Sequence, residues 1–474
     1  MIFSSFQYPL FLIGCLAIFF CLPYGVRLYF LWLVSIIGAF LWNSVSGIIL
    51  LFETSVAYIA ARYIGSQSCE IKRKWAVGIA SVLLLAGLAF FKYADFFLDS
   101  CSLVRSWCGI SEPLPHLKLL LPVGISFYSF MCLGYVIDVY RKKCAVETNW
   151  FRVGLFAGFF PHFASGPIGQ SADLLPQFRE KQHCVPENLE IGFRLILWGL
   201  FKKVVIADRL AQFADPVFAA PGNYSGFTAL VAMYFFTIQI YCDFSGYSDI
   251  AIGSAKMFGI DLMQNFRQPY FADSIYEFWK RWHISLTSWF RNYMYIPMGG
   301  NRVSFLHWQF NIFMVFLVSG LWHGAAWTFV IWGALHGGVY LMERWSGKGL
   351  ALLLPNVSFA WAKGIRIFVT FHIVAFAWIF FRSASFNTAT VFLSRIWNHW
   401  GAFQWGATKI PVCIAFGLIV FLFFAEVLIA IGWSGDYLNK GRCPGWLRCV
   451  GYSGLLCTLA LLGIRSNSFI YLQF

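Results

Sequence analysis

The heptapeptide Val318-Ser319-Gly320-Leu321-Trp322-His323-Gly324 lies in the middle of an uncharged run from Phe310 to Leu341. About 20 apolar residues span a bilayer, so this run is too long for one membrane crossing and predicts two crossings with a break between them. Gly320 and Gly324 supply permissive backbone for that break on either side of His323. An ionisable ring inside a membrane is costly to keep, so we expect His323 to carry function.

The composition of the whole chain supports insertion into a membrane. Of its 474 residues, 59% are hydrophobic and only 12% are charged, whereas soluble proteins carry about 25% charged residues. We therefore predict an all-α polytopic membrane protein with about ten or eleven transmembrane helices, accompanied by re-entrant or amphipathic helices. Residues 1–474 are expected to form a single integral-membrane domain.

The net charge of +14 comes largely from basic residues in short loops between apolar runs, as the positive-inside rule expects. We expect no nucleic-acid binding, because the chain has no basic arm and no soluble basic domain. The thirteen cysteines show no CxxC or Cys/His ligand spacing, so we expect no metal. The loops at 70–74 and 141–143 are expected to be cytoplasmic, which places the N-terminus outside.

The most polar long stretch covers residues 265–302. Ser274 and Glu277 fit a capping box, and apolar residues recur with a helical period as far as Tyr293. This pattern predicts one amphipathic helix, aromatic on one face and basic on the other, at the bilayer interface. His283 faces its aromatic side and is the second histidine candidate. A purely structural interfacial helix fits the same pattern.

The stretch Tyr241-Cys242-Asp243-Phe244-Ser245-Gly246-Tyr247-Ser248-Asp249 places two carboxylates amid hydrophobic sequence. Helical spacing puts Tyr241, Ser245 and Asp249 on one face, while Asp243 points elsewhere. These polar groups could bind substrate or orient a histidine. They could equally form hydrogen bonds between membrane helices.

Two further histidines lie in apolar sequence. His336 follows His323 by thirteen residues, which corresponds to roughly 20 Å along a straight helix. We therefore expect His336 near the opposite membrane face in a structural role. His372 lies inside the expected crossing 365–381 and is expected to be a hydrogen-bond partner rather than a site residue.

A series of strings, in chain order, resembles the bacterial membrane-bound O-acyltransferases, especially the branch that O-acetylates alginate. The strings are Leu121–Tyr128, Tyr135–Arg141, Gly199–Lys203, Gln239–Gly253, Phe278–Leu286, Trp289–Arg291, Tyr295–Pro297, Gly320–Gly324 and Phe469–Tyr471.

The resemblance implies a helical bundle with a central tunnel in a bacterial inner membrane. It implies that His323 is the essential histidine and that His283 is the second one. The expected donor is cytoplasmic acetyl-CoA. The acetyl group would reach an extracytoplasmic polysaccharide such as alginate, cellulose or peptidoglycan, usually through an exported periplasmic acyltransferase as partner. Lys280, Arg281 and Arg291 match the family's basic aromatic segment.

The chemistry expected of these residues is general-base catalysis, in which a neutral imidazole takes the proton of a hydroxyl that attacks a thioester. Trp322 would shape a narrow apolar passage. The basic face of 274–293 could attract coenzyme phosphates or anionic membrane lipid, and the sequence does not choose between them. The candidate substrate-binding residues are Trp322, Asp243, Ser245, Asp249, Lys280, Arg281 and Arg291.

Three rival functions remain. One is a D-alanyl transferase for teichoic acids, fed by a carrier protein. Another is a transporter without acyl chemistry, which the absence of an internal repeat disfavours. The last is a structural scaffold, whose interior would have no need of His323, Asp243 and Asp249 at membrane depth.

Overall fold

A computed structural model describes residues 7–110, 112, 114–345, 359–405, 409–430, 445–464 and 469. Within these ranges all regular structure is helical. The longer helices are α1 (Gln7–Cys21), α2 (Tyr24–Trp42), α3 (Ser44–Ser66), α4 (Glu70–Leu88), α5 (Ala94–Trp107), α6 (Ile125–Tyr140), α7 (Trp150–Gly158), α9 (Pro186–Leu200), α10 (Asp208–Ala219), α11 (Gly226–Met257), α14 (Phe305–His323), α15 (Trp327–Trp345), α16 (Phe359–Arg382), α17 (Phe386–Asn398), α18 (Lys409–Ala430) and α20 (Gly445–Leu462). The short segments are η1 (Ala89–Tyr93), α8 (Ser171–Leu174), η2 (Pro176–Phe178), η3 (Phe201–Ala207), η4 (Pro221–Asn223), η5 (Pro269–Phe271), α12 (Ile275–Arg281), α13 (Ile284–Phe290) and η6 (Arg291–Tyr295).

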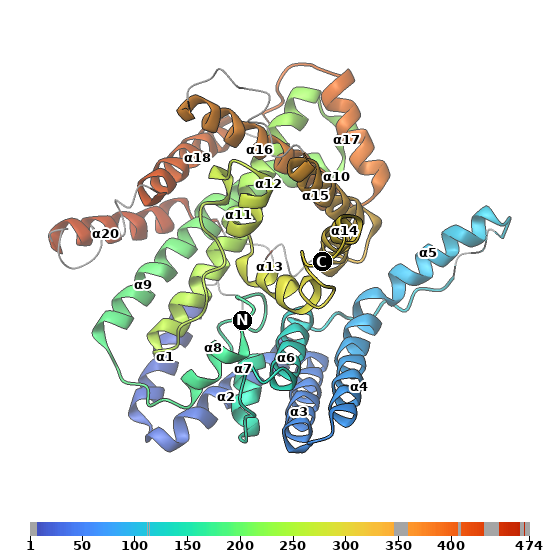
Figure 1. The fold of residues 1–474 in the computed structure, drawn as a ribbon. Helices are drawn as coiled ribbons and strands as arrows, with labels where there is room; N and C mark the ends of the chain where they lie inside the picture. The colour runs from blue at the N-terminus through green and yellow to red at the C-terminus, as the bar shows by residue number, and fades with distance from the viewer. Residues whose placement is uncertain are drawn as a thin grey trace.

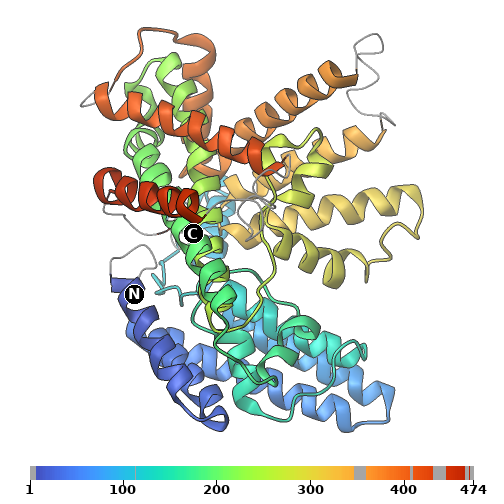
Figure 2. The same ribbon diagram turned by 90° about the vertical axis from the view of Figure 1, so that its left-hand side faces the viewer.

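The helices form two groups around a short central segment. In Figure 1, α1 to α4, α6 and α7 make up the lower group, and α13 lies inside the ring of longer helices. The upper group is organised by α11, a helix of 32 residues that is buried along most of its length and packs on α9, α10, α16 and α17. On its outer side, α18 and α20 cover α9, η3 and α10 (Figure 2).

Seven helices in the described ranges are long and apolar enough to cross a membrane: α2, α3, the continuous run from α4 to α5, α11, α14, α16 and α18. Three shorter apolar helices, α1, α6 and α20, accompany them. The all-α polytopic prediction is therefore confirmed. The run Glu70–Trp107 has 38 residues, and Figure 1 shows its last part, α5, extending away from the body of the protein.

The two basic loops predicted to be cytoplasmic lie at the same end of the bundle. Arg73 donates a hydrogen bond to the backbone carbonyl of Tyr140, and the Tyr140 hydroxyl donates to Glu70 at 2.6 Å. The start of α4 and the end of α6 are thus joined. This contact agrees with the prediction that 70–74 and 141–143 share one side of the membrane.

The single amphipathic helix predicted over residues 274–293 is wrong. Ser274 is the N-cap as predicted, since its hydroxyl accepts from the backbone N–H of Glu277 at 3.2 Å, but the helix ends after seven residues, at Arg281. Trp282 is extended, and His283 has φ +44°, in the left-handed region that helices exclude. A periodic pattern does not reveal such a break, because the side chains keep their apolar spacing across it.

The predicted break after His323 is present, but Gly320 and Gly324 serve close packing there rather than unusual backbone angles. α14 ends at His323 and α15 begins at Trp327, and the two helices pack against each other. A side chain at Gly320 would collide with the backbone carbonyl of Phe329, and one at Gly324 with the Phe329 ring. Neither glycine has a positive φ. They allow close helix approach, as small residues do in membranes.

Candidate active site

The two candidate histidines lie side by side in the protein interior. The ring centroids of His323 and His283 are 6.2 Å apart, and the two residues are 3% and 0% exposed. His323 is the last residue of α14, and His283 is the joint between α12 and α13. The chain thus brings together two histidines that each stand where a helix breaks.

Aromatic rings enclose this pair. Trp322 lies 5.9 Å from His283 and 5.1 Å from His323, measured between ring centroids. Phe244 of α11 stacks edge-on against His283 at 4.6 Å. Phe469 packs on Phe244 at 5.9 Å, so part of the last family string reaches this enclosure, while residues 470 and 471 lie outside the described residues. The predicted contribution of Trp322 to an apolar passage stays a prediction.

Asn265 determines the orientation and the tautomer of His283. Its Oδ1 accepts from the backbone N–H of Ser285 at 3.2 Å and from the Ser285 hydroxyl at 2.9 Å, and its Nδ2 donates to Ser248. That oxygen also lies 3.2 Å from Nδ1 of His283. An amide oxygen can only accept, so this contact is a hydrogen bond in the tautomer that carries the proton on Nδ1 and, in the neutral ring, the lone pair on Nε2.

Lys92 of η1 lies against the other histidine. Its ammonium donates to the backbone carbonyl of Trp322 at 2.6 Å and to that of His323 at 3.1 Å. A charged group inside the membrane-spanning run from α4 to α5 is expensive unless it is satisfied in this way.

The polar residues of α11 pair with two adjacent lysines of η3. Lys202 binds Asp249 at 2.7 Å and Ser245 at 2.8 Å, while Lys203 binds Asp243. The prediction that Ser245 and Asp249 share a face, with Asp243 pointing elsewhere, is confirmed. These contacts favour the alternative in which the three residues join helices, and their proposed substrate binding remains a prediction.

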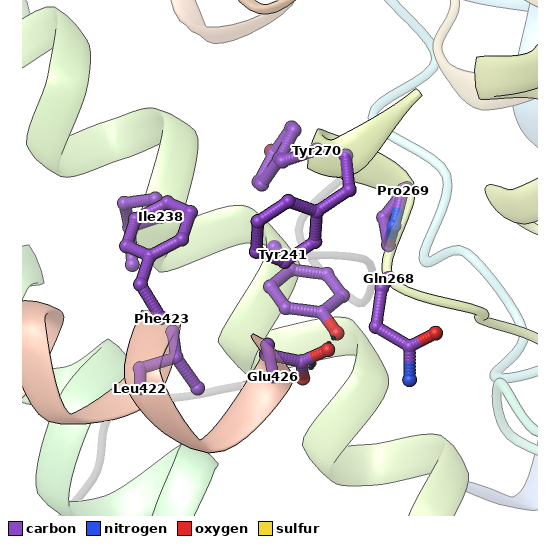
Figure 3. Close-up of a pocket in the computed structure, with 9 residues that line it drawn as sticks. Ile238, Tyr241, Gln268, Pro269, Tyr270, Leu422, Phe423 and Glu426 are labelled. Atoms are coloured by element: carbon purple, nitrogen blue, oxygen red, sulfur yellow. Dashed lines mark hydrogen bonds between the residues drawn. The ribbon is translucent and has the colours of Figure 1, made fainter. Parts of the chain in front are cut away.

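Tyr241 of α11 reaches a buried carboxyl group on α18. Its hydroxyl donates to Glu426 at 2.8 Å, beside a cavity of about 10 Å³ that the two residues line together with Gln268 (Figure 3). Such a cavity has room for about one water molecule. The contact ties α18 to the centre of the fold.

The predicted basic residues lie on the surface. Lys280 is half-exposed and pairs with Glu277 at 2.9 Å, and Arg281 lies 3.8 Å from the same carboxylate. Arg291 is exposed at the start of η6. Lys280 and Arg281 thus contact Glu277 rather than the histidine rings, and the substrate binding expected of the three basic residues stays a prediction.

The expected position of His336 is wrong. The ring of Trp332 lies 5.1 Å from His323 and 4.9 Å from His336, so one indole separates the two histidines. The straight-helix distance fails because α15 reverses direction after the break and packs back on α14. His372 is a hydrogen-bond partner as expected, since its Nε2 lies 2.9 Å from the Tyr234 hydroxyl.

Sequence reasoning missed Lys92, Asn265 and Glu426. A usable signal existed for Lys92 and Glu426, because Lys92 ends an uncharged apolar run from Trp75 to Phe91 and Glu426 is the one charged residue in the apolar run 410–430. Asn265 gave none, since an asparagine at the start of a polar stretch is ordinary. Within the described ranges no three His, Cys, Asp or Glu side chains converge as metal ligands, and the expectation of no metal stays a prediction.

Comparison with known proteins agrees with this architecture. Residues 149–386 match the model of the membrane-bound O-acyltransferase family. A probable alginate O-acetylase of Pseudomonas aeruginosa is 41% identical over 67% of this chain and 59% of its own length. A peptidoglycan O-acetyltransferase of Helicobacter pylori is 35% identical over 81% of this chain and 78% of its own length. A teichoic acid D-alanyltransferase of Bacillus subtilis is 26% identical over 65% of this chain and 84% of its own.

Three of the alginate O-acetylases match over only 59%, 64% and 61% of their length. The matched family region contains both histidines and the pairs between η3 and α11, whereas Lys92 lies before it. The family match covers half of the chain, and the peptidoglycan O-acetyltransferase aligns over most of both proteins. This chain is therefore a member of the membrane-bound O-acyltransferase family.

Proposed function

We propose that this protein is an O-acetyltransferase of the bacterial inner membrane that acts on an extracytoplasmic polysaccharide. The observation that carries the proposal is the pair formed by His323 and His283, whose ring centroids lie 6.2 Å apart in a buried aromatic enclosure. Alginate O-acetylases and a peptidoglycan O-acetyltransferase among the relatives support both the acetyl group and the type of acceptor.

His323 is the general base in this proposal. It takes the proton of the acceptor hydroxyl as the hydroxyl oxygen attacks the carbonyl carbon of a thioester. The carbon–sulfur bond then breaks, and the proton passes from the imidazolium to the leaving thiolate. Help of this kind contributes roughly 10²–10⁴-fold to the rate. His283 offers its Nε2 lone pair as a second acceptor, since its Nδ1 proton is held by Asn265.

The donor in this proposal is acetyl-CoA, which enters from the cytoplasmic side. Ser126 lies 3.4 Å from the Lys92 ammonium, which binds the carbonyl of His323. From Ser126 to Tyr140, at the end with the basic loops, α6 rises by about 21 Å. An acyl group on a long flexible arm suits a base at such a depth. The attacking hydroxyl would enter from the opposite side, and an exported partner acyltransferase would then carry the acetyl group on to the polysaccharide.

Fewer residues bind substrate in this proposal than the sequence indicated. Trp322 lines the acyl passage, because its ring lies against both histidines. Lys280, Arg281 and Arg291 attract the phosphates of the donor or the lipid headgroups around it. We assign Asp243, Ser245 and Asp249 to the joining of α11 to η3, because each of them binds a lysine there.

The test compares acetyl incorporation into extracytoplasmic polysaccharide in cells that carry the wild-type protein or His323→Ala at matched membrane abundance. His372→Ala is the matched control, since it removes another membrane histidine that hydrogen-bonds to Tyr234. We expect loss of acetate with His323→Ala and near wild-type acetate with the control.

Unchanged acetylation with His323→Ala would remove this residue from the chemistry. A wild-type protein that transfers no acetate would turn the assay to a D-alanyl thioester of a carrier protein, in view of the D-alanyltransferases among the relatives.

A further inference from the structure

The C-terminal end of α14 is held by two neighbouring residues of a distant helix. A helix leaves its last four carbonyls without intrahelical partners, and inside a membrane each unsatisfied carbonyl is costly. At the end of α14 all four are bound. Gly320 accepts from the N–H of Gly324 at 3.3 Å, and Leu321 accepts from the Tyr93 hydroxyl at 2.8 Å. The carbonyls of Trp322 and His323 accept from the Lys92 ammonium.

Two adjacent residues of η1 bind one row of carbonyls. Both Lys92 and Tyr93 belong to the π-helical turn Ala89–Tyr93, and both reach the end of α14. π-Helical turns are rare, appear mostly as single turns inside α-helices and are frequent at functional sites. A positive charge also suits this position, because the C-terminus of a helix carries partial negative charge.

The Lys92 ammonium lies close to His323 and Trp322. It binds the carbonyl of His323 itself and lies 5.8 Å from the centroid of the Trp322 ring. Binding the carbonyls on both sides of the His323 amide nitrogen fixes the backbone from which the imidazole projects. Its third contact, at 3.4 Å, is to Ser126 of α6, so the ammonium joins α6 to the end of α14.

We propose that Lys92 is a positioning residue for His323: through the two carbonyls it fixes the direction of the imidazole toward the reacting hydroxyl. The inference rests on the proposed function of His323 as base. A helix cap that serves stability alone is the rival explanation, and the two differ in their effect on the rate of a folded variant.

Arg209 provides a matched control. Its guanidinium donates to the backbone carbonyl of Leu462 at 2.6 Å, at the end of α20. Arg209→Met therefore removes a charged cap from another membrane helix of the same protein, away from the histidine pair. Lys92→Met removes the corresponding group from α14 and leaves a side chain of similar length.

The experiment measures kcat and KM for acetyl-CoA in membrane vesicles that contain the full-length protein, with label in the acetyl group and the cell's own polysaccharide as acceptor. Thermal unfolding in detergent is measured on the same variants. We expect Lys92→Met to lower kcat by about 10²-fold, the order of loss that a 1 Å displacement causes, with little change in KM. Lys92→Gln and Lys92→Arg should restore kcat in steps, because they return one or more donors.

The control Arg209→Met should keep the wild-type kcat even if its unfolding temperature falls as far as that of Lys92→Met. A folded Lys92→Met protein with the wild-type kcat would overturn the inference. If Lys92→Met does not accumulate, Lys92→Gln decides. Its amide is shorter than the lysine side chain and returns only part of the contacts, so its kcat should stay well below the wild-type value, and equality with the wild type would overturn the inference. An inactive wild-type protein would instead count against the proposed function.

Discussion

Asn265→Ala tests whether the second histidine works through one tautomer. Asn265 is fully buried, and its Oδ1 is the acceptor for Nδ1 of His283 at 3.2 Å. Losing a hydrogen bond of this kind costs about 0.5–1.5 kcal/mol. At 1.4 kcal/mol per factor of ten, the bias toward the Nδ1–H tautomer falls roughly 2- to 12-fold. The freed ring can also turn, and a displacement of about 1 Å costs up to 10²-fold.

We therefore expect kcat for acetyl transfer to fall by roughly 10- to 100-fold in Asn265→Ala, with KM for acetyl-CoA nearly unchanged. Ser248→Ala is the matched control, since it removes the partner of the Asn265 Nδ2 and leaves all contacts of Oδ1 in place. Both variants are measured in the labelled-acetyl assay at equal membrane abundance. A wild-type kcat in folded Asn265→Ala, or an equal loss in Ser248→Ala, would refute the assignment of a tautomer to His283.

Two further predictions concern buried charge. Lys203→Met leaves the Asp243 and Asp208 carboxylates without their shared ammonium and should lower the free energy of unfolding by about 3–5 kcal/mol. Lys203→Met with Asp243→Asn should recover part of the loss in a detergent unfolding assay, and no recovery would mean that Asp243 has another role. Glu147 lies in a loop outside the membrane helices, where burial acts to raise the pKa of its carboxyl but hydrogen bonding from the Asn149 N–H and the Arg179 guanidinium holds that pKa below its ordinary value. The contribution of this carboxylate to stability is therefore full above about pH 4.3, the ordinary glutamate pKa, and is lost as the pH falls through the lowered pKa of the folded protein. Wild type and Glu147→Gln should differ in unfolding temperature at pH 7 and converge in acid. A difference that stays constant with pH would contradict this ion pair.

The membrane architecture was predictable because it depends on composition and length. Apolar runs of about 20 residues determine crossings whatever their neighbours are. The placement of the loops 70–74 and 141–143 on one side of the membrane was predictable from their positive charge. The contact between Arg73 and the Tyr140 carbonyl agrees with that placement. The single face shared by Ser245 and Asp249 followed from helical spacing alone, since α11 is unbroken from Gly226 to Met257.

The candidate site was predictable only in part, because its geometry depends on contacts between distant segments. His323 stood out as an ionisable ring beside glycines, but nothing local placed His336 one indole away. His283 was expected to be buried because of helical spacing, and it is buried for another reason, the left-handed turn that separates α12 from α13. No periodicity encodes that turn, which depends on Asn265, the acceptor of two backbone N–H groups at the start of α13.

Each histidine of the pair stands at a broken helix, and at each break polar groups from elsewhere in the chain bind the exposed backbone. Irregular backbone at membrane depth is tolerated only where protein or water satisfies it. Lys92 meets that need at the end of α14, and Asn265 meets it at the start of α13 by accepting at its own carbonyl and at Oδ1. Under the roles proposed for His323 and His283, the same hydrogen bonds satisfy the backbone and direct the rings, so stability and catalysis would be coupled at both residues. Measurements of rate on folded variants, rather than of abundance, are therefore what can separate the two roles.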